Sequence, residues 1–389
     1  MSNVRGQDSA PLHLVDTTMF WSPRGGGVRR YLLAKRAQLT RQGDWRHTLV
    51  APGAQGDGMV DCGGMPLPFS GGYRVPWRRA AAARLIAAQQ PDVIEAGDPY
   101  RLAGAAIDAA RWCGVPAVLF CHSDVATLAA HTIARRKLLG AHRSQVWARG
   151  AEQRVNRYLS RLCDRFDLVL APSRTMQQRL QSLGVMHAQV QPLGVDTRVF
   201  SPRARDEHWR AALGLPMNAR LLLYAGRFAP EKNLQQLAEA VQRLGPRYHL
   251  LALGAGPQPP VGDQVHVLGF QAQAAQVARA MASVDAFVHA GDQETGGLAV
   301  LEAMACGTPV LVRDAGGLRE AVAGGCGFAV DSDRPHDWAE AIAELFMSNR
   351  ASVHAALARA HSHEWSLVLA ALQRRYARAI ERRQQFRRP

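Results

Sequence analysis

The stretch ETGGLAVLEAMACGTPVLVRDAGGLRE, residues 294–320, combines two glutamates, a pair of glycines, a helical pattern and an apolar run. Glu294 and Glu302 lie eight positions apart, and a helical pattern begins at Leu298. Glycines let a backbone approach a ligand closely, and the free N–H groups at the start of a helix favour a phosphate. We expect one carboxylate on each side of a diphosphate, accepting hydrogen bonds from sugar hydroxyls. Taken alone, two glutamates at this spacing are more often a solvated helix face.

The segment YAGRFAPEKN, residues 224–233, follows an apolar run and supplies two cations. Arg227 and Lys232 flank a turn that contains proline, so both side chains can lie beside one anion. Fixed positive charge stabilises the negative charge that develops when the bond between a sugar and a nucleoside diphosphate breaks. Such a reaction needs no metal ion. Taken alone, the segment favours a surface ion pair with Glu231 or another acid.

Apolar runs alternate with helical stretches along the whole chain, which is typical of parallel α/β sheets. The expected strands are residues 12–16, 47–53, 91–97, 116–122 and 167–173 in the first half, and 220–227, 248–256, 264–270, 285–291 and 308–316 in the second. Ligands of open α/β sheets lie at the carboxyl ends of the strands. We therefore expect the functional residues at the ends of these runs.

The length of 389 residues exceeds what one ordinary hydrophobic core supports, so we expect two domains. Prolines and glycine interrupt the pattern at residues 191–206, which marks the exit from the first domain. The expected boundaries are 1–200 for the first domain and 201–365 for the second. A terminal helix at 366–389 is expected to pack back on the first domain.

The chain is strongly basic, with a formal net charge of +15 and a pI near 10.4. Residues 131–165 hold nine Lys or Arg against two acids, and the last sixteen residues hold seven Arg. Arg154, Arg157, Arg161 and Arg165 recur at helical spacing and form one basic face, which suits either an anionic membrane surface or a solvated helix. These stretches lack interleaved stacking aromatics, so we expect no nucleic-acid partner.

Other classes of protein are disfavoured by composition. No apolar run approaches the ~20 residues that span a bilayer, and the first residues lack the layout of a signal peptide. We expect a cytoplasmic protein, with a peripheral position at the inner face of the cell membrane as the alternative. The six cysteines lie far apart without a C-x-x-C pair, so neither a disulfide framework nor a metal site is expected.

Together these segments resemble the family-4 retaining glycosyltransferases, or glycosyl transferases group 1, of the GT-B fold. The resemblance covers nearly the whole chain and rests on four motifs: RGGGVRRYL at 24–32, a histidine ending a strand at 122, G-x-x-x-x-E-K from Gly226, and the two-glutamate segment that continues into EAMACGTPV. It implies two Rossmann-like domains facing each other across a cleft. The chain departs from the family at Gly296, where an aromatic residue is usual, so the shape of the sugar pocket does not follow from the resemblance.

The resemblance also implies a role for each matching residue. The residues it places in catalysis are Arg227 and Lys232 on the donor diphosphate, Glu294 on the transferred sugar and His122 on the sugar or its backbone. Those it places around the donor are Gly26, Gly27, Gly254, Gly269, Gly297, Leu298 and Glu302, with Glu302 on the ribose hydroxyls. The alternative for His122 is a packed imidazole at a strand end. The implied donor is a UDP-sugar or GDP-sugar, the implied chemistry is front-face attack with retention, and no metal ion takes part.

The acceptor is the least determined part of the reaction. Family members that use lipid acceptors carry a basic first domain, so we expect a lipid or lipid-linked acceptor, with a soluble sugar or polysaccharide as the alternative. Asp98 and Asp124 follow strands of the first half and are acceptor candidates, although turn and cap roles are common for such residues. A nucleic-acid-binding protein is the alternative from another class, and only the charge favours it.

Overall fold

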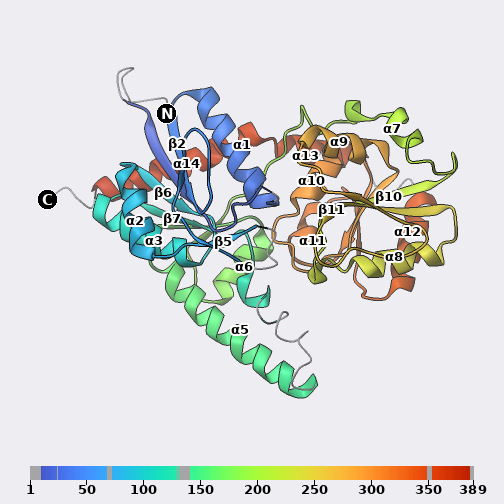
Figure 1. The fold of residues 1–389 in the computed structure, drawn as a ribbon, viewed down its shortest axis with the longest axis horizontal. Helices are drawn as coiled ribbons and strands as arrows, with labels where there is room; N and C mark the ends of the chain where they lie inside the picture. The colour runs from blue at the N-terminus through green and yellow to red at the C-terminus, as the bar shows by residue number, and fades with distance from the viewer. Residues whose placement is uncertain are drawn as a thin grey trace.

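The computed structural model describes residues 10–23, 25–67, 72–128, 130, 141–347 and 353–385. It contains two α/β lobes that lie side by side, each built on a parallel sheet with helices on both faces (Figure 1). The predicted fold class, two Rossmann-like halves of the GT-B type, is confirmed. Part of the basic stretch at 131–165, namely 131–140, lies outside the described residues, and so do Arg24 and the last four positions of the chain.

The first lobe contains a seven-stranded parallel sheet in the order β3-β2-β1-β6-β7-β8-β9. Its strands are β1 (Leu12–Thr17), β2 (Trp45–Ala51), β3 (Met59–Asp61), β6 (Val93–Ala96), β7 (Ala117–Phe120), β8 (Leu168–Ala171) and β9 (Ala188–Val190). A small hairpin pairs β4 (Met65–Pro66) with β5 (Arg74–Val75). The helices are α1 (Gly27–Gln42), α2 (Arg79–Ala88), α3 (Arg101–Cys113), α5 (Ala141–Cys163) and α6 (Arg174–Ser182).

The second lobe contains a six-stranded parallel sheet in the order β12-β11-β10-β13-β14-β15. Its strands are β10 (Arg220–Arg227), β11 (Tyr248–Ala255), β12 (Val265–Gly269), β13 (Ala286–His289), β14 (Val310–Arg313) and β15 (Phe328–Val330). Its helices are α7 (Glu207–Ala211), α8 (Leu234–Arg243), α9 (Ala274–Ser283), α10 (Leu298–Ala305), α11 (Gly316–Val322), α12 (Pro335–Met347) and α13 (Val353–Ser362), with short 3-10 turns at Pro202–Ala204 and Pro230–Lys232.

Each of the ten expected apolar runs contains a strand, because buried parallel strands are continuously apolar and end where polar residues or glycine begin. The strands β3, β4, β5, β9 and β15 were not predicted. Each has only two or three residues, which is too short to show a periodic pattern.

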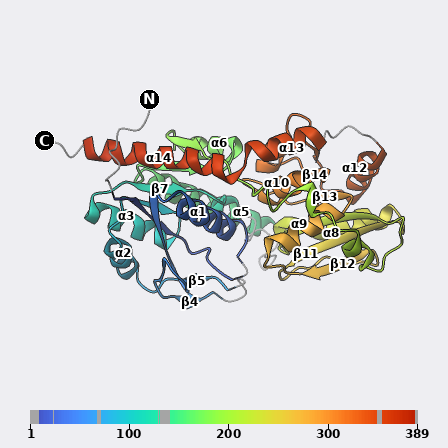
Figure 2. The same cartoon turned by 90° about the horizontal axis from the view of Figure 1, so that it is seen from above.

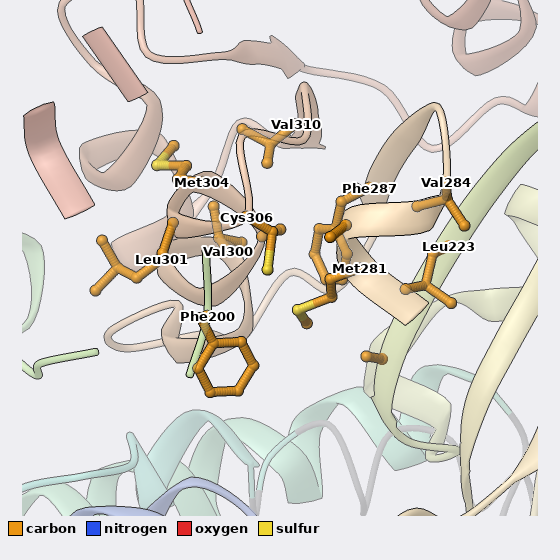
Figure 3. Close-up of a cluster of buried hydrophobic side chains, with 14 of the residues drawn as sticks. Phe200, Leu223, Met281, Val284, Phe287, Val300, Leu301, Met304, Cys306 and Val310 are labelled. Carbon is orange, nitrogen blue, oxygen red and sulfur yellow. The ribbon is translucent and has the colours of Figure 1, made fainter. Parts of the chain in front are cut away.

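Apolar side chains fill both faces of the second sheet. One cluster lies under α9, α10 and α13 and includes Met281, Phe287 and Met304 (Figure 3). Phe200 enters the same cluster from the segment that connects the lobes and is 4% exposed. The connecting segment is therefore fixed to the second lobe by burial of an aromatic ring, which removes a large apolar area from water.

The chain crosses between the lobes a second time before its last helix, α14 (Trp365–Gln385). At this crossing, the backbone of Val195 pairs with the segment just before α14. Val195 N–H donates to His363 O at 2.8 Å, and Trp365 N–H donates to Val195 O at 3.1 Å. Beyond this point α14 lies along the first lobe (Figure 2), and Leu369, Leu372 and Tyr376 are buried in that lobe's core.

The helix α5 extends away from both sheets (Figure 1). Along its described side chains Trp147 is 63% exposed and Tyr158 is 48% exposed, beside Arg154, Arg157 and Arg161. None of the helices in the described part of the chain is both long and apolar enough to cross a membrane.

Candidate active site

Lys232 and Glu294 meet in a salt bridge at the carboxyl edge of the second sheet. Lys232 follows β10 and Glu294 follows β13, which are neighbouring strands, so their ends bring the two side chains together. His289 Nε2 lies 3.4 Å from the same carboxylate. Burial by itself would raise the pKa of Glu294, but Lys232 and then His289 outweigh it and hold that pKa well below its ordinary value. Glu294 is therefore an ionised hydrogen-bond acceptor.

The loop that presents Glu294 is held by two glycines of α11. The N–H of Gly317 donates to Glu294 O at 2.7 Å, and a Cβ on Gly316 would lie 2.4 Å from that oxygen. Gly297, which precedes α10, has a φ of 61°, in the left-handed region that favours glycine. The glycines of the 294–320 segment thus shape the backbone around Glu294 and the start of α10.

Arg227 stands at the end of β10 with its side chain 53% exposed. Its guanidinium lies 3.2 Å from Glu231, which is the surface ion pair that the segment favours when read alone. Tyr224 is buried beneath this turn, and its hydroxyl donates to Arg227 O at 2.9 Å. Burial raises the pKa of Tyr224 well above its ordinary value, with a further contribution from Glu294, so this phenol stays neutral.

Glu302 lies in α10 with its side chain 4% exposed, and its partner comes from the other lobe. Arg30 of α1 donates through one nitrogen to both carboxylate oxygens. Burial raises the pKa of Glu302, while Arg30 opposes that rise, and the net shift is upward. The sequence reasoning missed Arg30, although it lies inside the quoted motif RGGGVRRYL at 24–32.

His122 follows β7, and its backbone contacts the second lobe. Its ring stacks on Phe120 with centroids 4.0 Å apart, and its backbone oxygen accepts a hydrogen bond from Thr295 Oγ1 at 2.5 Å. Burial and then Lys35 lower the pKa of His122 to about 3, so the imidazole is neutral. Its Nε2 is buried and has no hydrogen-bond partner in the part of the chain that the structure describes.

The remaining donor-side candidates lie around these groups. A Cβ on Gly27 would lie 3.7 Å from Leu298, so the starts of α1 and α10 face each other. Gly26 and Gly269 have open space on their Cβ side. Gly254 has a φ of 155°, and a Cβ there would lie 1.9 Å from Gly226 O, so glycine is required for the close approach of β11 to the end of β10.

The two acceptor candidates both have structural partners. Asp98 is buried and accepts hydrogen bonds from Thr18 Oγ1 at 2.8 Å and Met19 N–H at 2.6 Å. Burial raises its pKa, although these hydrogen bonds oppose the rise. Asp124 accepts from Thr127 and lies 3.0 Å from Arg179. Turn, cap and ion-pair contacts therefore account for both aspartates.

A pocket of about 490 Å³ opens on the first lobe next to the Asp98 turn. Its lining residues are Met19, Val75, Arg79, Tyr100, Arg101, Gly104, Tyr158, Leu162 and Arg165. Arg79 is paired with Asp108, while Arg101 donates to the backbone oxygens of Pro76 and Trp77 at 3.1 Å. The pocket combines basic and aromatic side chains at the carboxyl edge of the first sheet, and the sequence reasoning did not identify it because its residues come from four separate segments.

Two family models match the chain: Glycosyltransferase Family 4 over residues 25–199 and Glycosyl transferases group 1 over residues 205–360. The chain is 26% identical over 351 residues to a GDP-mannose-dependent alpha-(1-6)-phosphatidylinositol dimannoside mannosyltransferase of Mycobacterium tuberculosis, covering 85% of this chain and 87% of that protein. It is 34% identical over 236 residues to a GDP-mannose-dependent alpha-mannosyltransferase of Mycolicibacterium smegmatis, covering 60% of this chain and 58% of that protein.

Solved structures with the same architecture have low sequence identity. Sucrose-phosphate synthase from Thermosynechococcus elongatus superposes with a TM-score of 0.76 at 17% identity, over 94% of this chain and 98% of that chain. Anabaena HepE in complex with UDP and glucose gives a TM-score of 0.72 at 18% identity, over 94% and 99%. These similarities show the fold.

Proposed function

Because this chain belongs to the family-4 glycosyltransferases of the GT-B fold, we propose that it transfers a mannosyl or glucosyl unit from a GDP-sugar or UDP-sugar to a lipid or lipid-linked acceptor, with retention of configuration. The observation that carries the proposal is the Lys232–Glu294 salt bridge, which lies one residue from the hydrogen bond that Thr295 donates to the backbone of His122 across the lobes. The relatives named as GDP-mannose-dependent transferases make GDP-mannose the first donor to test.

On the donor side, Lys232 and Arg227 would hold the diphosphate and stabilise its charge as the glycosidic bond breaks. Lys232 forms a salt bridge with Glu294, and a bound diphosphate would share this cation. The remaining lone pairs of Glu294 would then accept hydrogen bonds from sugar hydroxyls. The buried Nε2 of neutral His122, which has no hydrogen-bond partner among the described residues, suits a hydrogen bond to the same sugar. Fixed cations supply the positive charge, so we expect no metal requirement.

On the acceptor side, the pocket beside Asp98 contains three arginines and two tyrosines. Guanidinium groups bind phosphate oxygens well, and aromatic rings pack against sugar or polyol faces. This chemistry favours an acceptor with an anionic headgroup. A relative that acts on a phosphatidylinositol dimannoside and the exposed Trp147 on basic α5 both favour a lipid acceptor over a soluble one.

Donor binding is tested by thermal shift. GDP-mannose, UDP-glucose and ADP-glucose are added in turn, and a ligand at about 100 times its Kd should stabilise the fold by about 2.7 kcal/mol. Lys232→Ala should abolish the shift because it removes the cation beside the diphosphate. Arg243→Ala removes an exposed charge at the opposite end of α8 and serves as the matched control. Equal shifts in the parent and in Lys232→Ala would contradict this assignment.

The acceptor class is tested separately with vesicles. Flotation with phosphatidylglycerol-containing vesicles at moderate salt should recover the protein with the lipid, and transfer from the donor found by thermal shift should go into the lipid phase. Absence of binding, together with transfer to a soluble sugar acceptor, would favour the soluble alternative.

A further inference from the structure

Arg30 is bound to the Glu302 carboxylate, which the resemblance to family-4 glycosyltransferases assigns to the ribose hydroxyls of the donor. Both oxygens of Glu302 accept from the same guanidinium nitrogen, and no other side chain of the described residues donates to them. The Glu302 side chain is 4% exposed, so its lone pairs have little access to water. A ribose diol that binds these oxygens would therefore meet the Arg30 guanidinium there.

The contact joins residues that are distant in sequence and lie on different lobes. Arg30 is near the start of α1 and Glu302 is in α10, and the starts of these helices face each other where Gly27 lies near Leu298. Two further polar contacts lie at the same junction: Thr295 Oγ1 donates to His122 O, and the carboxylate of Glu320 accepts from the N–H of Arg174 at 2.8 Å. The Arg30 ion pair is thus part of the surface where the lobes meet.

Exchange of this ion pair for hydroxyl hydrogen bonds has a cost. The two charges of an ion pair attract each other more strongly inside a protein than in water. A buried carboxylate that loses its cation therefore needs hydrogen bonds from other donors. The ribose is neutral, so it replaces a charged donor with neutral ones, which form weaker hydrogen bonds to a carboxylate. Only molecules in which Glu302 is free of Arg30 can bind the ribose fully. The apparent Kd for the donor therefore rises as the fraction of such molecules falls.

We propose that Arg30 competes with the nucleotide ribose for the Glu302 carboxylate, so that donor binding breaks a contact between the lobes. This inference rests on the proposed function, because it needs a nucleoside diphosphate that uses Glu302. It makes Arg30 a determinant of donor affinity. It also predicts that ligands without a ribose do not meet this competition.

The test compares Arg30→Gln with Arg29→Gln. The glutamine at position 30 can still donate to Glu302 but lacks the charge, so the carboxylate keeps a weaker partner. Arg29 is the matched control, because it loses the same charge one residue away and its guanidinium lies over Trp21, 5.5 Å from the ring centre. Calorimetric titration with GDP and with pyrophosphate measures the Kd of each protein for a ligand with and without ribose.

We expect the ratio of GDP affinity to pyrophosphate affinity to rise on the order of fivefold in Arg30→Gln and to stay at the parent value in Arg29→Gln. The ratio removes the general effect of losing one positive charge near an anion. An unchanged or lower ratio in Arg30→Gln would overturn the proposal, since Arg30 would then be neutral toward the ribose or a direct ligand of it. If the parent binds neither GDP nor UDP, the proposed donor site itself fails.

Discussion

His122 combines a stacked, partly buried ring with a neutral charge state. Its imidazole lies against Phe120 and its pKa is lowered to about 3, first by burial and then by Lys35. In the unfolded chain the ordinary pKa is about 6.5. As the pH falls below that value the unfolded chain takes up a proton that the folded protein does not, so this contribution to stability is complete above pH 6.5 and is lost toward pH 3.

His122→Phe should keep the ring stacking and remove this pH dependence. Between pH 7 and pH 5 the free energy of unfolding of the parent should fall by up to about 2 kcal/mol more than that of the variant. Urea unfolding at the two pH values, followed by tryptophan fluorescence, measures the difference, with exposed His187→Gln as the control. Parallel pH profiles for parent and His122→Phe would mean that His122 protonates equally in both states.

The terminal helix α14 is fixed to the first lobe by buried charge as well as by apolar packing. Lys35 of α1 is 1% exposed and donates to Asp16 at 2.8 Å, Glu95 at 2.7 Å and Tyr376 of α14 at 3.2 Å. Burial would raise the pKa of Asp16, but Lys35 and His47 outweigh it and lower that pKa. For Glu95 burial prevails over Lys35, and the pKa is raised. One cation thus serves two carboxyl groups.

Lys35→Met should remove the cation that the two carboxyl groups share and leave Asp16 with His47 as its remaining salt-bridge partner among the described residues. We expect the free energy of unfolding of the first lobe to fall by about 3 to 5 kcal/mol. Tyr376→Phe removes only a hydroxyl and should cost about 1 to 2 kcal/mol. Urea unfolding measures the loss of stability in each variant, and the rate of proteolysis at α14 gives a second measurement. Adding Glu95→Gln to Lys35→Met should recover part of the loss, and no recovery would contradict this account of the cluster.

The lobes are docked closely where the chain departs from its family. A Cβ on Gly296 would lie 2.9 Å from Leu193 and 3.1 Å from Pro172, both of which belong to the first-lobe side of the junction. An aromatic side chain at this position therefore has no room. Glycine allows the Glu294 loop to reach the first lobe, where Thr295 contacts the backbone of His122.

Gly296→Phe should separate the lobes while leaving the second sheet intact. We expect a larger radius of gyration by small-angle scattering and a transfer rate lower by about tenfold or more, since small misplacements of reacting groups are costly. The thermal shift with the donor should remain, because Lys232 and Arg227 stay in place. Leu193→Ala in the same variant should restore part of the rate. A full transfer rate in Gly296→Phe would show that the junction tolerates the ring.

The sequence by itself determined the two parallel sheets and the residues at their carboxyl ends. Buried parallel strands must be apolar throughout, so ten strands were visible as runs, and Lys232 and Glu294 followed two of them. Neighbouring strand ends then bring these side chains together, as the structure confirms. The left-handed backbone at Gly297 was not predicted, since a glycine was expected there for close approach to a ligand.

Only the tertiary structure decided the charged contacts that join the two lobes or attach α14. Arg30 and Glu302 are 272 positions apart, and Lys35 and Tyr376 are 341 apart, so no local pattern links them. The same is true of Gly296 against Leu193, whose contact depends on how closely the lobes approach. Local periodicity reports burial and backbone conformation within an element. The partner of a long charged side chain depends on which surfaces pack together, and that is settled only when both lobes and α14 are in place.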